Sequence, residues 1–129
     1  MVKRAIQCEV YSYGIYTRWD KTSKALPKLV EITTKIPIKE DIEFGYVLKI
    51  KGAKGKLLTY IIEHPQMVDD NGNQLPPFEG TVIVSSNNYD FFLGDTVWEP
   101  YSQMIGEWNL ITKIEDRIIV QKKLMLFLE

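Results

Sequence analysis

Residues that most often carry chemistry are scarce in this sequence, which has one cysteine, Cys8, and one histidine, His64, among its 129 residues. A single cysteine excludes an intrachain disulfide. Because secreted domains often use disulfides, we expect a reducing, cytoplasmic location. Cys8 alternates with Ile6 and Val10, which is typical of a small buried residue, so we do not expect a reactive thiol.

An excess of charge is also absent, because 16 lysines and arginines balance 17 aspartates and glutamates, for a formal net charge of -1. Such a balance does not attract DNA, RNA or an anionic membrane, so we expect no nucleic-acid partner. No window reaches the roughly 18 apolar residues of a membrane-spanning helix, and we expect no membrane span. The expected partner is therefore an unidentified protein or a small ligand.

What the sequence does contain is alternation of apolar and polar residues with a period of two, from end to end. Its length fits one domain, residues 1–129, and 45% of its residues are hydrophobic, enough for a sizeable core. Strands are expected over 4–17, 28–36, 43–51, 56–64, 80–87, 106–115 and 117–128. About seven short strands separated by turn signals predict an all-β, antiparallel, immunoglobulin-like sandwich without a disulfide.

The strand pattern also predicts connections and faces. Residues 52–55 are expected to form a hairpin loop, 66–79 a long polar connection, and 88–101 an irregular aromatic segment. A two-residue turn is expected at 115–116. The residues expected to point into the core from four of the strands are Val30, Ile32, Thr34, Ile36, Phe44, Tyr46, Leu48, Ile50, Trp108, Leu110, Thr112, Ile114, Ile118, Val120, Leu124, Leu126 and Leu128.

The sequence contains no recognisable motif for catalysis, metal binding or cofactor binding. Glu63 and His64 point to opposite faces of a strand, so they form no ready acid–base pair, and we expect the His64 ring to bond to backbone or water. The acidic run 69–73 has its glycine at the wrong spacing for a calcium loop and is expected to be an Asn-Gly turn. We therefore predict no catalytic residue, no metal and no cofactor.

The most unusual stretch is 89–101, where five of thirteen residues are aromatic and are mixed with acids. Aromatic side chains give a large contact area at low entropic cost, which is typical of binding surfaces. The alternative is that they fold back over the end of the core as a plug. The residues predicted to form a partner-binding or ligand-binding surface are Trp19, Tyr89, Phe91, Phe92, Trp98 and Tyr101.

Five short motifs follow one another in a familiar order: residues 13–16, 36–37, 44–46, 63–65 and 106–108. In this order they resemble a bacterial domain-of-unknown-function family with an immunoglobulin-like β-sandwich fold. The resemblance implies the sandwich and a bacterial source, and it implies no activity. The family pattern has Asp-Gly in the last hairpin, where this chain has Asp116 and Arg117, which leaves the type of that turn open.

We expect a non-catalytic binding or protein-interaction module rather than an enzyme. Two alternatives stay open: a hydrolase-type enzyme with a site near His64, and a structural accessory domain of a surface or envelope assembly. Exposed strand edges would also allow a homodimer by edge pairing.

Overall fold

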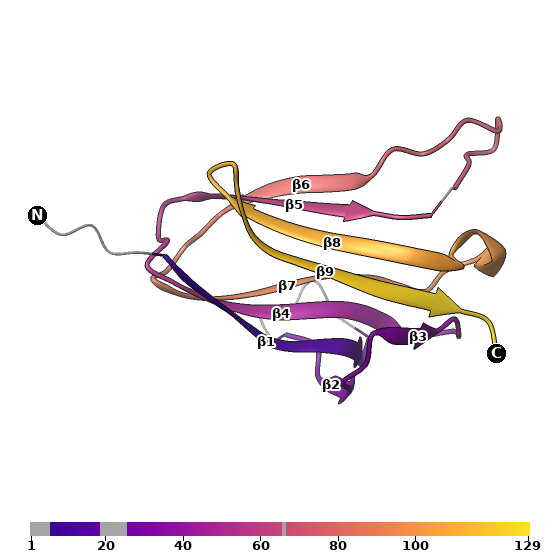
Figure 1. Ribbon diagram of the computed structural model, residues 1–129, viewed down its shortest axis with the longest axis horizontal. Coiled ribbons are helices and arrows are strands. Elements are labelled where there is room, and N and C mark those ends of the chain that lie inside the picture. Colours follow the sequence, from indigo (N-terminus) through magenta and orange to yellow (C-terminus); the bar gives the residue numbers. More distant parts are fainter. Residues whose placement is uncertain (1–5, 19–25, 66) are drawn as a thin grey trace, which may run out of the picture.

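Two β-sheets stacked face to face make up the computed structural model, which describes residues 6–18, 26–65 and 67–129 (Figure 1). One sheet has the order β2-β1-β4-β7 and the other the order β3-β9-β8-β5-β6. The elements are β1 (Gln7–Tyr16), β2 (Leu29–Glu31), β3 (Lys35–Pro37), β4 (Glu43–Lys51), β5 (Leu57–Glu63), β6 (Phe78–Ile83), β7 (Asn88–Thr96), η1 (Tyr101–Gln103), β8 (Gly106–Ile114) and β9 (Arg117–Phe127). The prediction of an all-β sandwich is confirmed, with nine strands in the described residues instead of about seven.

One extra strand arises because the segment expected as a single strand, 28–36, divides between the two sheets. β2 pairs with β1, whereas β3 pairs with β9 in parallel, so the sandwich is not purely antiparallel. The backbone N–H of Lys35 donates to the Thr33 hydroxyl at 3.0 Å, and this local bond turns the chain between the two strands. Val30, Ile32 and Thr34, expected in the core, are all exposed on this segment.

The other extra strand is β7, where an irregular segment was expected, and that prediction is wrong for 88–96. Phe91, Phe92 and Leu93 are all buried, so the sequence there shows no alternation although the backbone is extended. β7 pairs with β4 along its whole length, with Val47 opposite Phe92. A strand buried on both faces carries a continuous apolar run, which hides its period.

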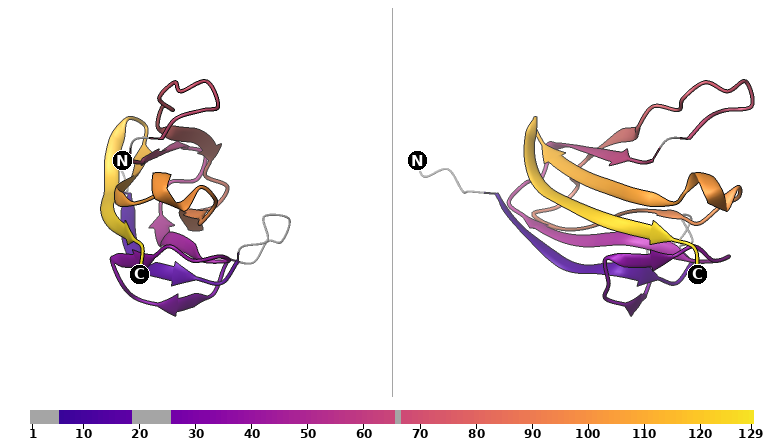
Figure 2. Two further views of the ribbon diagram at one scale, coloured as in Figure 1. Left: turned by 90° about the vertical axis from the view of Figure 1, so that its right-hand side faces the viewer. Right: turned by 45° about the vertical axis from the view of Figure 1, so that its right-hand side comes forward.

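The hairpin expected at 52–55 is also wrong, because β4 and β5 belong to different sheets. The turn is an arch from one layer to the other. Its backbone is held by the connection between β6 and β7: Gly52 N–H donates to Asn87 O at 3.1 Å and Gly55 N–H donates to Val84 O at 2.8 Å. The described part of the connection from β5 to β6 projects beyond the sheets at one end (Figure 2).

Between the sheets lies the main core, and most inward positions are as predicted. Trp108 is fully buried, stacks edge-on against Phe44 at 5.2 Å, and donates its indole N–H to Met104 O at 2.9 Å. The hydroxyls of Tyr46 and Thr112 lie 2.6 Å apart and join the two layers. Burial raises the pKa of Tyr46 above its ordinary value, so this phenol stays protonated.

Two positions of the last strand differ from the prediction. The register of β9 against β8 shifts between Thr112 and Lys113, which inserts Ile119 and turns Ile118 to the outer face. Ile118 and Leu128 are both exposed, Leu128 because it follows the end of β9. The η1 helix has three residues, and no described helix is long and apolar enough to cross a membrane.

Candidate functional site

A second, smaller core covers the outer face of the four-stranded sheet. It consists of Tyr16, Val47 and Phe92, one from each of three neighbouring strands, with Leu26 packed on them. The rings of Tyr16 and Phe92 meet edge to face at 5.1 Å. The outer face of an antiparallel sheet is usually polar, so this apolar cluster marks a surface that the chain itself partly covers.

A bulge in β1 directs two neighbouring side chains to this same face. The register of β1 against β4 shifts between Val10 and Ser12, so Tyr11 is inserted next to Ser12 opposite Val47. Ser12 is buried and Tyr11 is exposed. The Ser12 and Tyr16 hydroxyls lie 2.8 Å apart, and burial raises the pKa of Tyr16 above its ordinary value while this hydrogen bond lowers it.

Glycines in register allow the backbone to approach closely beside this cluster. Gly14 pairs with Gly45, and Gly45 pairs with Gly94. A Cβ on Gly14 would lie 2.2 Å from the carbonyl oxygen of Glu31, and one on Gly45 would lie 2.1 Å from that of Leu93. Their φ angles of 127° and 156° also favour glycine. The strip therefore lets β2 fold tightly onto the end of β1.

A buried carboxylate closes the same end of the sheet. Glu43 is almost fully buried on the outer face, and the Thr96 hydroxyl lies 3.0 Å from each of its carboxylate oxygens. Thr96 pairs with Glu43 across the strands. Burying a carboxylate is costly unless it is hydrogen-bonded, so this contact belongs to the packing of the sheet.

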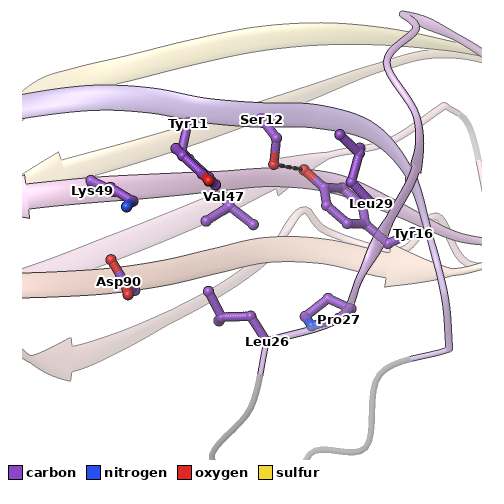
Figure 3. Close-up of a pocket in the computed structure, with 9 residues that line it drawn as sticks. All are labelled: Tyr11, Ser12, Tyr16, Leu26, Pro27, Leu29, Val47, Lys49 and Asp90. Carbon is purple, nitrogen blue, oxygen red and sulfur yellow. Dashed lines mark hydrogen bonds between the residues drawn. The ribbon is translucent and has the colours of Figure 1, made fainter.

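A groove of about 530 Å³ lies between the sheet and the covering segment, which we define as residues 26–29 (Figure 3). Figure 3 shows Leu26, Pro27 and Leu29 along one wall and Val47 on the floor. Lys49 and Asp90 lie at the opposite end. The lining residues are Tyr11, Ser12, Tyr16, Leu26, Pro27, Leu29, Val47, Lys49 and Asp90.

The charged end of the groove is close to neutral. Glu9, Lys49 and Asp90 stand in one row across β1, β4 and β7. The Lys49 ammonium lies 4.2 Å from the centre of the Tyr11 ring, a cation–π contact. An ammonium between two carboxylates offers little attraction to an anion, whereas the row supplies both donors and acceptors.

The structure separates the residues predicted to form an aromatic surface. Tyr89 and Phe91 lie on the inner face of β7 with their rings stacked at 6.4 Å, and Phe92 lies on the outer face. Trp98 and Tyr101 pack, partly buried, against the main core. Adjacent residues of a strand point to opposite faces, which is why the segment cannot present all its rings together. Trp19 lies outside the described residues, and binding by these side chains stays a prediction.

His64 behaves as expected for a strand-end histidine. Its Nδ1 lies 2.7 Å from Pro65 O and its Nε2 lies 2.8 Å from Pro76 O. The ring also packs on Phe78, with centroids 4.6 Å apart. Both acceptors are backbone carbonyl oxygens, so a neutral imidazole, which has one N–H, donates to one of them at a time. Either bond ties the ring to the projecting connection, and within the described chain these hydrogen bonds to backbone give the hydrolase alternative no support.

The acidic run at the tip of that connection forms the predicted Asn-Gly turn. One carboxylate oxygen of Asp69 accepts from the backbone N–H groups of Asn71 and Asn73, both at 2.9 Å. Gly72 takes a positive φ of 81°. The Asp69 carboxylate therefore has a structural role in this turn.

Cys8 on β1 was predicted to be buried; the structure places it partly buried, packed against the main core. Burial raises the pKa of the Cys8 thiol to about 11. The reactive thiolate is therefore rare near neutral pH, which agrees with a structural cysteine.

The sequence prediction missed the groove, although a signal for it exists. Tyr16, Val47 and Phe92 fall on the outward phase of three strands whose inward phase is already apolar. Apolar residues in the outward phase of neighbouring strands indicate a covered face. Recognising them requires the order of the strands, which the alternation alone does not supply.

An immunoglobulin-like β-sandwich is the class that this fold defines. A solved structure of an immunoglobulin-like protein from Pseudomonas aeruginosa matches with a TM-score of 0.76 and 19% sequence identity, covering 98% of this chain and 100% of that chain. Residues 4–125 match the family model described as "Domain of unknown function (DUF3859)", so the chain belongs to that family. The comparison with curated proteins finds no match.

Proposed function

We propose that the domain is a non-catalytic binding module and that the groove under the covering segment holds an apolar side chain of a partner protein. The observation that supports this is the apolar floor on an outward sheet face, formed by Val47 and Tyr16. A volume of about 530 Å³ lies in the range of about 300–1,000 Å³ typical of ligand sites.

The chemistry of the groove favours a polypeptide segment over an anionic ligand. Leu26, Leu29 and Val47 offer contact to an aliphatic or aromatic side chain. At the other end, Lys49 and Asp90 can pair with the amide groups that flank such a side chain. An anion would have to compete with Glu9 and Asp90 for the single ammonium of this row.

The proposal can be tested with peptides selected from a displayed random library against the whole chain. Dissociation constants of the selected peptides are then measured by calorimetry for Tyr11→Ala and Leu29→Ala. The matched controls, Ile83→Ala and Leu57→Ala, lie on the outer face of the other sheet. The Ile83 side chain is 59% exposed, against 62% for Tyr11, and the Leu57 side chain is 42% exposed, against 40% for Leu29.

We expect each groove variant to weaken peptide binding at least tenfold, as loss of a central contact residue does, while both controls bind like the unchanged protein. Selected peptides should share an apolar residue without a common acidic residue. The groove is excluded as the site if the library yields no binder. It is also excluded if Ile83→Ala and Leu57→Ala weaken peptide binding while the groove variants do not.

A further inference from the structure

The outer face of the five-stranded sheet is unusually apolar for a surface that the described chain leaves open. On β5, β6 and β8 the inward side chains include Leu58, Val82 and Leu110, which pack in the core. Their neighbours Leu57 and Ile83, and Ile118 on β9, are exposed. The apolar and threonine side chains in the outward phase of this face are Leu57, Thr59, Ile61, Thr81, Ile83, Ile111, Ile118 and Met125, of which Ile111 is only 9% exposed.

These side chains are contiguous across four strands. Leu57 pairs with Ile83 between β5 and β6. Ile61 pairs with Ile111 between β5 and β8, at the middle of the sheet. A continuous apolar patch rimmed by charges is typical of a protein interface.

Charges on the open face are sorted by strand. Glu63 and Glu79 lie on β5 and β6, in the outward phase, and Glu63 accepts a hydrogen bond from the Asn109 side chain at 2.6 Å. Lys113 and Lys123 lie on β8 and β9; Glu107 on β8 forms an ion pair with Lys123 at 3.6 Å. One half of the face is therefore acidic and the other half is rich in lysine.

We propose that the open face pairs with the same face of a second copy of this chain, about a twofold axis parallel to the strands between β5 and β8. This axis sets β6 against β9 of the second copy and β5 against its β8, so each acidic half meets a lysine-rich half. A twofold axis across the strands would set the acidic halves against each other. Charge complementarity therefore selects the first arrangement, with the partly exposed Ile61 at its centre.

The size of the face sets the strength of the pairing. Strands about 4.8 Å apart with a rise of about 3.4 Å per residue give four strands a face of about 20 by 20 Å. Several hundred Å² per copy lies at the small end of specific interfaces. The dimer is accordingly weak, with a dissociation constant of roughly 10 µM to 1 mM.

Sedimentation equilibrium of the full chain from about 1 µM to 1 mM measures this association. We expect the unchanged protein to dimerise and Ile83→Lys or Ile118→Lys to weaken dimerisation at least tenfold. Val30→Lys and Ile32→Lys are the matched controls, because these side chains are equally exposed on and beside β2. A chain that stays monomeric at 1 mM overturns the proposal, as do controls that weaken it equally.

Charge reversal tests the axis itself. Glu79→Lys and Lys123→Glu are each expected to weaken self-association several-fold, because like charges then lie diagonally opposite each other, two residues apart along the facing strands, twice in every dimer. An equimolar mixture of the two variants restores opposite charges at both contacts and should associate as strongly as the unchanged protein. A mixture no stronger than the separate variants overturns the arrangement. Tyr11→Ala should leave association unchanged, so failure here is separate from failure of the groove proposal.

Discussion

The two sheets share one core but differ on their outer faces. On the four-stranded sheet, the covering segment crosses the surface and packs Leu26 onto a second apolar cluster that contains Val47 and Phe92. On the five-stranded sheet, nothing in the described chain covers Ile83 or Ile118. One sheet therefore has a groove beside the covering segment, whereas the outer face of the other sheet leaves apolar side chains exposed among charged ones.

Burial along single strands records the same difference. β4 is buried at almost every position, whereas β6 alternates between partly buried and exposed residues. A strand covered on both faces contributes more to stability per residue, because both sets of side chains leave water. The covered sheet thus gains packing on both faces, whereas the open sheet leaves one face exposed in the described chain.

The largest change in stability is expected from a substitution in the covered face. Phe92→Ala removes a ring that is 5% exposed and leaves a cavity beside Tyr16, so we expect a loss of about 3 kcal/mol in the free energy of unfolding. The matched change on the open face, Ile83→Ala, should stay within about 0.5 kcal/mol. Urea unfolding at constant m value measures both.

Equal losses from these two substitutions would show that the second cluster adds no packing of its own. A large loss of stability from Ile83→Ala alone would indicate that a second copy covers the open face at the protein concentration used. Unfolding at two concentrations separates these readings, because dimerisation makes stability depend on concentration.

A smaller effect concerns the polar contact in the groove floor. Tyr16→Phe leaves the buried Ser12 hydroxyl without the partner that lies 2.8 Å away, and should cost about 1–2 kcal/mol. Ser12→Ala should cost about 1 kcal/mol, and the double variant less than the sum, because the two hydroxyls serve each other. Tyr11→Phe is the exposed control. Additive losses in the double variant would contradict a shared hydrogen bond.

The inner faces could be predicted from the sequence because they depend on local alternation. The bounds of β4 agree with the expected 43–51, and Trp108 and Leu110 are buried as expected. Each inward residue is followed by an outward one, and this pattern needs no knowledge of neighbouring strands. The same reasoning identified the Asn-Gly turn after Asp69 and the structural role of His64.

The groove could not be predicted in this way because it depends on contacts between distant segments. Leu26 reaches Val47 and Phe92 only after the chain has returned across β1. The bulge that brings Tyr11 beside Ser12 is a matter of register against β4. The arch at 52–55 contains the glycines that are typical of a hairpin. It is not a hairpin, because β4 and β5 belong to different sheets, and the local sequence does not show this.

The two sheets also differ in the turns that join their neighbouring strands, and substitutions in these turns are expected to change stability least. β8 and β9 of the open sheet are joined by Glu115 and Asp116, whose φ angles of 46° and 69° identify a type I′ turn. This resolves the turn type left open by the sequence, and it puts Arg117 in the strand. In the covered sheet, by contrast, no neighbouring strands of the described chain are joined by so short a turn.

A positive φ costs a residue with a Cβ more than it costs glycine, although glycine also raises the entropy of the unfolded chain. We expect Asp116→Gly to raise the free energy of unfolding by about 0.5 kcal/mol and Asp116→Ala to lower it by a similar amount. Both changes act on the open sheet and should leave peptide binding in the groove unaltered. Urea unfolding and calorimetry of the same two variants measure this, and a loss of stability with glycine would contradict the turn assignment.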